Sequence, residues 1–184
     1  MKAWRGALIA LSFLLLSGCL VTFRDPLPAA EALPKGLLGQ WASTDAWGDA
    51  MSLQLTRLGN DRYQAVAWFK ARPHEREAYP FTVSRHGNRW YLSAKVPAQY
   101  GGRYAIAGFE LTDRHELVLY SLDLEQINQA IAQKALDGRG FATDAGDGVQ
   151  VDSGLDKVFA YLDDPANSDV FVEAARYRRQ GKAE

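Results

Sequence analysis

Cysteine is nearly absent from this chain of 184 residues, which contains only Cys19. No disulfide can form within such a chain, so packing alone must hold the fold. The chain has three histidines, His74, His86 and His115, and none lies in an H-E-x-x-H pattern. Each stands among charged residues in an expected loop or hairpin tip, which is typical of surface histidines. The sequence therefore predicts no metal site.

Motifs of nucleophilic catalysis and an excess of charge are missing as well. The chain contains neither G-x-S-x-G nor S-x-x-K, the patterns that position a catalytic serine. Residues 143–148 with Asp152 gather acidic side chains but lack the spacing of a calcium-binding loop, which favours an Asp/Gly-rich turn. The formal net charge is −1, and basic and acidic residues are interleaved. We expect no catalytic residue, no cofactor and no nucleic-acid partner.

An export signal begins the chain. Two basic residues precede an apolar run over residues 7–16, and small residues then lead to Cys19. The run is shorter than the roughly 20 apolar residues that a membrane-spanning helix needs, so we expect a signal peptide over residues 1–18. There are two alternatives. The segment can be an ordinary secretory signal with an unrelated cysteine, or a membrane helix that is never removed.

The stretch LSGC at residues 16–19 resembles the lipobox of bacterial lipoproteins. The resemblance implies that Cys19 becomes the mature N-terminus, with diacylglycerol on its sulfur and an acyl chain such as palmitate on its amine. Several acyl chains together anchor a protein stably in a bilayer. Leu20, rather than aspartate, follows the cysteine, which by analogy favours the outer membrane. The implied location is the cell envelope, on the periplasm-facing side of the outer membrane.

A tether and one folded domain are expected after the signal peptide. Residues 20–36 contain three prolines and no apolar period, and they end at Gly36. We therefore predict a lipidated N-terminus and a flexible tether over residues 19–36. The remaining residues, 37–180, are enough for a single domain with its own core.

Short alternating apolar runs separated by turn residues predict antiparallel strands in the first part of this domain. Three successive hairpins are expected: residues 51–56 with 62–69, 81–85 with 90–96, and 104–111 with 116–122. Several of these strands are apolar on both faces, for example through Phe109 on one face and Ile106 on the other. Such strands need cover from a barrel interior on one side or from a helix on the other.

Two helices are expected to provide cover from outside. Asp123 and Gln126 have the spacing of an N-terminal cap for the first helix, and Ser153 and Asp156 have a capping-box spacing for the second. The remaining elements are a short strand at residues 148–151 and a last strand at residues 170–179 that can close the sheet.

Gly39-Gln40-Trp41 resembles the G-x-W signature that opens lipocalins and related calycins. In those families the tryptophan plugs one end of a small antiparallel barrel, and an arginine from the last strand packs across it. The resemblance implies this role for Trp41, with Arg176 or Arg178 making the cation–π contact. The expected fold is mainly β with α additions (α+β), a lipocalin-like meander or small barrel packed with two C-terminal helices. The whole order of elements is similar to uncharacterised bacterial lipoproteins with lipocalin-like domains.

Two classes of function are compatible with these features. The first hypothesis is a noncatalytic, membrane-anchored lipoprotein that binds a small apolar or amphipathic ligand or docks on an envelope protein. The cationic residues at 70–76, beside Trp68 and Phe69, are typical either of a mouth for an anionic lipid or glycan or of a solvated loop. The alternative is an envelope enzyme acting on lipid or peptidoglycan, which would place His74 or His115 beside a carboxylate in a cleft.

Overall fold

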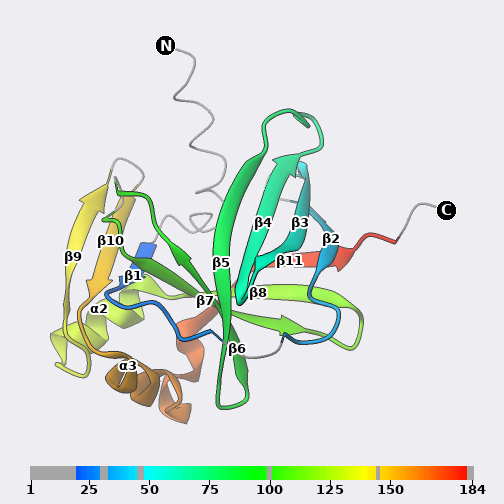
Figure 1. The fold of residues 1–184 in the computed structure, drawn as a ribbon. Coiled ribbons are helices and arrows are strands. Elements are labelled where there is room, and N and C mark those ends of the chain that lie inside the picture. Colours follow the sequence, from blue (N-terminus) through cyan, green and yellow to red (C-terminus); the bar gives the residue numbers. More distant parts are fainter. Residues whose placement is uncertain (1–19, 30–32, 45–47, 99–100, 144–145, 182–184) are drawn as a thin grey trace.

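The computed structural model describes residues 20–29, 33–44, 48–98, 101–143 and 146–181, and Figure 1 shows its ribbon. The predicted signal peptide and lipidation site, Cys19, lie outside the described residues. The strands are β1 (Leu20–Phe23), β2 (Gly39–Thr44), β3 (Ala50–Gly59), β4 (Arg62–Phe69), β5 (Glu77–His86), β6 (Arg89–Lys95), β7 (Tyr104–Leu111), β8 (Glu116–Leu122), β9 (Gly138–Thr143), β10 (Gly146–Val151) and β11 (Phe171–Arg179). The helices are α2 (Leu124–Ala132), α3 (Leu155–Leu162) and the 3-10 helix η2 (Pro165–Val170).

Eight of the strands close into an antiparallel barrel. Their order around the ring is β2, β3, β4, β5, β6, β7, β8 and β11, and β11 pairs with β2 to complete it. Every neighbouring pair in the ring is antiparallel. Closure satisfies the edges that an open sheet would expose. The predicted fold class, mainly β with helical additions, is confirmed.

The three expected hairpins are β3–β4, β5–β6 and β7–β8. Each tip contains a residue with a left-handed backbone: Asp61 has φ 56°, Gly87 has φ 56° and His115 has φ 58°. Tight turns between antiparallel strands use positive φ, which glycine, aspartate and histidine adopt more readily than most residues. The barrel strand β2, which begins at Gly39, is not among the strands that the sequence predicted.

β1, β9 and β10 extend the sheet beyond β7, and α2 and α3 pack beside them (Figure 1). We call this unit, consisting of β1, β9, β10, α2, α3 and η2, the lobe. β1 pairs in parallel with β10, from Leu20 opposite Gly148 to Phe23 opposite Val151, and antiparallel with β7. The lobe core lies between its own elements and the outer face of β6, β7 and β8.

Side-chain alternation explains why β7 is apolar on both faces. Phe109 belongs to the core inside the barrel, whereas Ile106 belongs to the lobe core. An odd spacing along a strand places two side chains on opposite faces. The predicted need for cover on both faces is therefore confirmed, and the barrel interior and the lobe supply it.

The segment that follows the predicted lipidation site is not a tether along its whole length. Leu20–Phe23 form β1, and all four residues are buried. Leu27 is also buried, at 3% exposure. The prediction of a flexible tether over residues 19–36 is wrong for residues 20–27, which belong to the folded domain. The run LVTF is rich in strand-forming residues but too short to show a period.

The two predicted helix caps have different outcomes. Asp123 caps α2, since its carboxylate accepts a hydrogen bond from the backbone N–H of Gln126 at 2.9 Å. Ser153 does not cap α3, whose N-cap is Gly154. The Ser153 hydroxyl instead accepts from the backbone N–H of Asp137 at 2.7 Å and donates to its carboxylate at 3.2 Å. The Ser153 side chain thus makes a contact across the lobe, whereas its spacing in the sequence had predicted a cap for the helix.

Candidate ligand-binding site in the barrel

The barrel interior contains a cavity of about 110 Å³. Its lining side chains are aliphatic or aromatic, and the two that carry polar atoms are Tyr79 and Tyr177. Five of the lining residues are alanines: Ala65, Ala67, Ala94, Ala105 and Ala107. Inward positions of a small barrel are normally filled by larger side chains. The alanines therefore keep the wall continuous while leaving its centre hollow.

Trp41 closes one end of the barrel. It is 1% exposed, and its indole N–H donates a hydrogen bond to the Leu37 carbonyl at 3.0 Å. The Arg179 guanidinium lies over the indole, 5.3 Å from the ring centroid, and donates to two carbonyls of the segment before β2. Gly39 has φ +135°, and a Cβ at this position would lie 2.9 Å from the same guanidinium. The positive φ favours glycine here, and the missing Cβ leaves room for the arginine to approach the chain.

The arginine that covers Trp41 is Arg179, so the prediction of Arg176 or Arg178 for this contact is wrong. Tyr177 is fully buried in the barrel core. Alternation then places residue 179 on the inner face with Tyr177 and turns residues 176 and 178 outward. The end of β11 carries three arginines within four positions, and their order alone did not reveal which of them faces inward.

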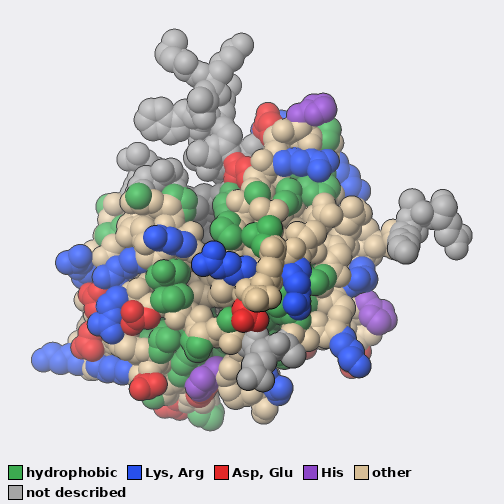
Figure 2. Space-filling model, viewed as in Figure 1, with side chains coloured by type: hydrophobic (Ala, Val, Ile, Leu, Met, Phe, Trp, Pro, Cys, Tyr) green, Lys and Arg blue, Asp and Glu red, His purple; other side chains and the backbone are tan. Residues whose placement is uncertain are grey.

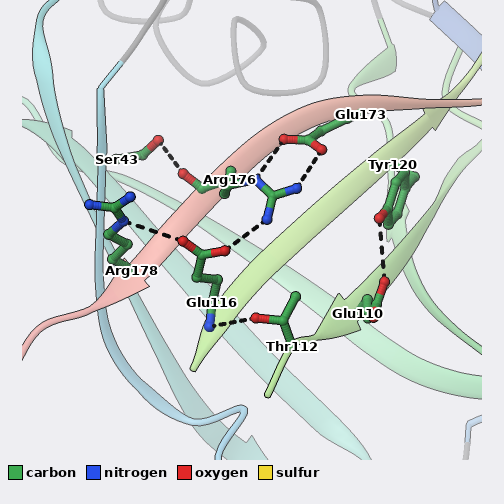
Figure 3. A network of polar contacts seen from close by, with 8 residues as sticks. All are labelled: Ser43, Glu110, Thr112, Glu116, Tyr120, Glu173, Arg176 and Arg178. Carbon is green, nitrogen blue, oxygen red and sulfur yellow. Dashed lines mark hydrogen bonds and ion pairs between the residues drawn. The ribbon is translucent and has the colours of Figure 1, made fainter. Parts of the chain in front are cut away.

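Arg176 and Arg178 both bind Glu116 on the outer face of the barrel wall (Figure 3). Arg176 donates to Glu116 at 2.8 Å and, through two nitrogens, to Glu173 at 2.9 and 2.7 Å. Hydrogen bonding from Arg176 is the main cause that holds the pKa of Glu116 below its ordinary value. The same network, led by Glu173, raises the pKa of Arg176. The cluster joins β8 to β11 on the side away from the cavity, so its role is structural.

Polar side chains stand at the other end of the barrel, where β4 ends and β5 begins. Tyr79 lines the cavity, and its hydroxyl donates a hydrogen bond to the Glu77 carboxylate. Both residues are only partly exposed. The inward side of this end thus offers a phenol and a carboxylate at the edge of an apolar space.

The cationic residues at 70–76 form the loop between β4 and β5, which projects from this end of the barrel (Figure 1). Arg72 lies over the ring of Phe69, 5.2 Å from its centroid, and Arg76 lies over Trp68 at 4.6 Å. Elsewhere on the visible face, basic and acidic side chains are interspersed (Figure 2). Because these arginines cover aromatic side chains of their own hairpin, the contacts favour the solvated-loop interpretation of the patch.

A larger hollow of about 710 Å³ lies where the barrel meets the lobe. His86, in the β5–β6 hairpin, stacks on Phe159 of α3 with ring centroids 3.8 Å apart. Its Nδ1 lies 2.8 Å from a carboxylate oxygen of Asp163. His74 and His115, which the enzyme hypothesis named, are exposed. The contact between a histidine and a carboxylate is therefore made by His86, and it joins the barrel to the lobe.

Two kinds of feature are not found in the part of the chain that the structure describes. No three His, Cys, Asp or Glu side chains there are grouped so that they could hold a metal ion. Within the same residues, no helix is long and apolar enough to cross a membrane.

The five cavity alanines were not predicted as site residues. Their signal in the sequence is the occurrence of alanine at alternate positions, as in Ala65 with Ala67 and Ala105 with Ala107. Alternation assigns the members of each pair to one face of a strand. The pattern does not reveal a cavity, however, because larger side chains across the barrel can fill the space that alanines leave.

The closed ring and its hollow centre define a β-barrel that has room for a ligand. Comparison of the chain with protein-family models, with curated proteins and with solved structures finds no match. The function must therefore be inferred from the barrel and its surroundings.

Proposed function

We propose that this protein is a noncatalytic, lipid-anchored component of the bacterial cell envelope that binds a small apolar or amphipathic ligand inside its barrel. The observation that carries the proposal is the cavity of about 110 Å³ with its apolar lining. Burial of apolar surface in such a space is favourable by roughly 25 cal/mol per Å². A water-filled or polar ligand site would instead present several hydrogen-bonding side chains to the cavity.

The size of the cavity limits the ligand. A dry apolar cavity of about 150 Å³ binds benzene, and the space here is smaller. The end of an unbranched alkyl chain fits such a space, whereas a fused ring system does not. No charged side chain is among the described residues that line the cavity, so the polar group of the same molecule stays outside it. We therefore favour a single-chain amphiphile whose tail occupies the barrel.

Docking on an envelope protein, the other branch of the first hypothesis, has less support. Among the described residues, the large hydrophobic side chains that are exposed are Leu58 and Val172. Protein-binding surfaces usually present contiguous apolar patches. Two separate side chains do not form one, so the cavity is the stronger basis for a function.

The proposed anchor rests on the resemblance of residues 16–19 to a lipobox. Cys19→Ala should leave the domain folded but prevent lipidation, because the acceptor sulfur is lost. We expect loss of fatty-acid label from the protein and failure to sediment with outer membranes. Membrane association that survived this substitution would contradict the anchor and the location.

Filling the cavity tests the ligand site. In Ala94→Leu and Ala107→Leu the added side chain takes the space of the ligand, and dodecanoate binding should weaken by about tenfold or more, a change of at least 1.4 kcal/mol. Binding is measured by isothermal titration calorimetry on chains that also carry Cys19→Ala. The matched control is Ala78→Leu, which adds the same side chain at an exposed position of β5.

Two cavity positions are used because overpacking can destabilise a core. Thermal unfolding identifies the variants that remain folded, and only these are compared with Ala78→Leu. A folded cavity variant that bound dodecanoate as tightly as the control would overturn the proposed site. Absence of dodecanoate binding to the parent chain would overturn the proposed ligand class.

A further inference from the structure

We propose that the barrel takes its ligand from the membrane that anchors it, through an opening between β7 and β8 that lies next to β1. The ligand is an acyl chain of a membrane lipid, which enters tail first. This inference rests on the proposed function, both for the lipid on Cys19 and for the cavity as a binding site. It adds the source of the ligand and the path by which it reaches the barrel.

β1 leaves no room for a spacer between the anchor and the domain. Leu20 is 5% exposed and pairs with Gly148, and the buried Thr22 donates a hydrogen bond to the Val149 carbonyl at 3.3 Å. Consecutive Cα atoms are about 3.8 Å apart, so a lipid on Cys19 begins one peptide bond from a fixed strand. The anchored protein therefore holds the start of β1 at the membrane surface.

The start of β1 lies beside a fork in the sheet. β7 pairs with β8 from Gly108 to Leu111 and, along the same edge, with β1 at Ala105 and Tyr104. Residues 106–107 lie between these two ladders, at the point where β8 leaves β7 and continues along β11. The barrel wall thus has a seam, where the same edge of β7 changes its partner from β8 to β1.

A small cavity of about 40 Å³ occupies this seam. Ala105, Ile106 and Ala107 all line it. Because successive side chains of a strand point to opposite faces, the cavity must lie at the edge of β7 rather than on one face. It shares Ala105, Ala107 and Leu119 with the barrel cavity, and Leu20 lines it as well. The seam cavity therefore adjoins both Leu20 and the barrel cavity, and the three shared side chains stand between the two cavities.

The energetics favour a path that starts in the bilayer. Transfer of an alkyl chain from lipid to an apolar cavity exchanges one apolar environment for another, whereas passage through water costs about 0.8 kcal/mol per methylene. The seam is lined mainly by apolar side chains, including Leu20, Leu119 and Leu122. When the seam is held at the membrane surface, the alkyl chain reaches it without passing through water. An opening at the end of the barrel far from the membrane would require that passage.

Moving the domain away from the membrane tests this path. The lipidated protein is placed in phosphatidylethanolamine and phosphatidylglycerol vesicles that contain a phospholipid with a diazirine near the end of one acyl chain. We expect photo-crosslinks to the cavity lining, mapped by peptide mass to Ala107 or Leu119. Insertion of about 12 Gly and Ser residues between Cys19 and Leu20 adds about 20 Å of flexible chain. The crosslinks should then fall several-fold.

Two further chains complete the experiment. The same insertion after Gly181 is the matched control and should crosslink like the parent, because it leaves β1 next to the anchor. Ala107→Leu in the lipidated protein should remove the crosslinks by filling the cavity, and a folded Ala107→Leu chain that kept them would contradict the proposed function itself.

The failure of this inference is distinguishable from the failure of the proposed function. If the insertion before Leu20 leaves the crosslinks unchanged, or if the parent gives none inside the barrel, the membrane path is wrong. Dodecanoate binding by the parent, measured by calorimetry, would still support the proposed function in either case.

Discussion

The barrel interior and the lobe core lie on opposite sides of the same strand, yet they are filled differently. Ile106 of β7 packs into a lobe core with large side chains such as Phe23 and Leu136. Ala105 and Ala107, which flank it, line the barrel cavity. The lobe demonstrates that this chain can pack the space beside β7 with bulky residues. The hollow on the other side is therefore not a necessity of the fold, which supports its use in binding.

Trp41→Ala should have the largest effect, because it opens the closed end of the barrel. The indole is almost completely buried and hydrogen-bonded, and loss of a large buried aromatic side chain costs about 3–5 kcal/mol. Urea unfolding followed by far-UV circular dichroism measures this loss. Trp68→Ala, on the outer face, should cost less, and a loss for Trp41→Ala below about 1 kcal/mol would contradict its role as a plug.

Ile127→Ala should weaken the lobe without changing the barrel. Ile127 lies on α2 and is fully buried in the lobe core, so truncation should cost about 2–5 kcal/mol in the free energy of unfolding. The affinity of the folded protein for dodecanoate should stay at the parent value. If the free energy of unfolding and the affinity for dodecanoate both fell, the two sides of β7 would be coupled. The barrel interior and the lobe core could then not be treated as independent.

Arg179→Ala should destabilise the barrel more than Arg178→Ala. The Arg179→Ala variant loses the cation–π contact with Trp41 and the hydrogen bonds to backbone carbonyls. Together these contacts are worth about 1–2 kcal/mol at a solvent-accessible site. Arg178 is 84% exposed, and its removal should change the urea midpoint little. The reverse order would return Arg178 to the role that the sequence first suggested.

Glu116→Gln should have the smallest effect, a loss of stability at neutral pH that disappears as the pH falls. Arg176 holds the pKa of Glu116 below its ordinary value of 4.5 in the folded protein. A carboxyl with a lowered folded pKa stabilises the fold above its unfolded pKa, and this contribution is lost as the pH falls through the folded value. The variant should therefore show a flatter decline in urea midpoint below pH 4.5. The control is Glu110→Gln, and an equal flattening there would contradict the assignment to Glu116.

Local patterns predicted the elements whose partners are close in sequence. The three hairpins follow from alternation and from turn residues such as Asp61 and Gly87. β1 and β9 were missed for a different reason. Leu20 pairs with Gly148, far along the chain, and β9 has the glycine-rich sequence GRGFAT. Neither segment carries a period that reveals a strand before its partner is known.

The candidate site was predictable only in part. Resemblance to the G-x-W signature located Trp41, and the structure places it in the barrel core with an arginine across it. Which arginine covers Trp41 depends on which residues of β11 point into the barrel. The cavity depends on the volumes of all the inward side chains around the ring. Lipidation of Cys19 stays a prediction, because the residue lies outside the described part of the chain.

The parallel pairing of β1 with β10 also sets an order of events during biogenesis. Thr22 and Val149, which share a hydrogen bond, are separated by 127 positions. A contact of such sequence separation closes a long loop and forms slowly. Under the proposed export the chain would emerge with its N-terminus first, so β1 would wait for nearly the whole polypeptide to be translocated before it finds β10. The strand next to the proposed anchor would thus be among the last to be locked into the fold.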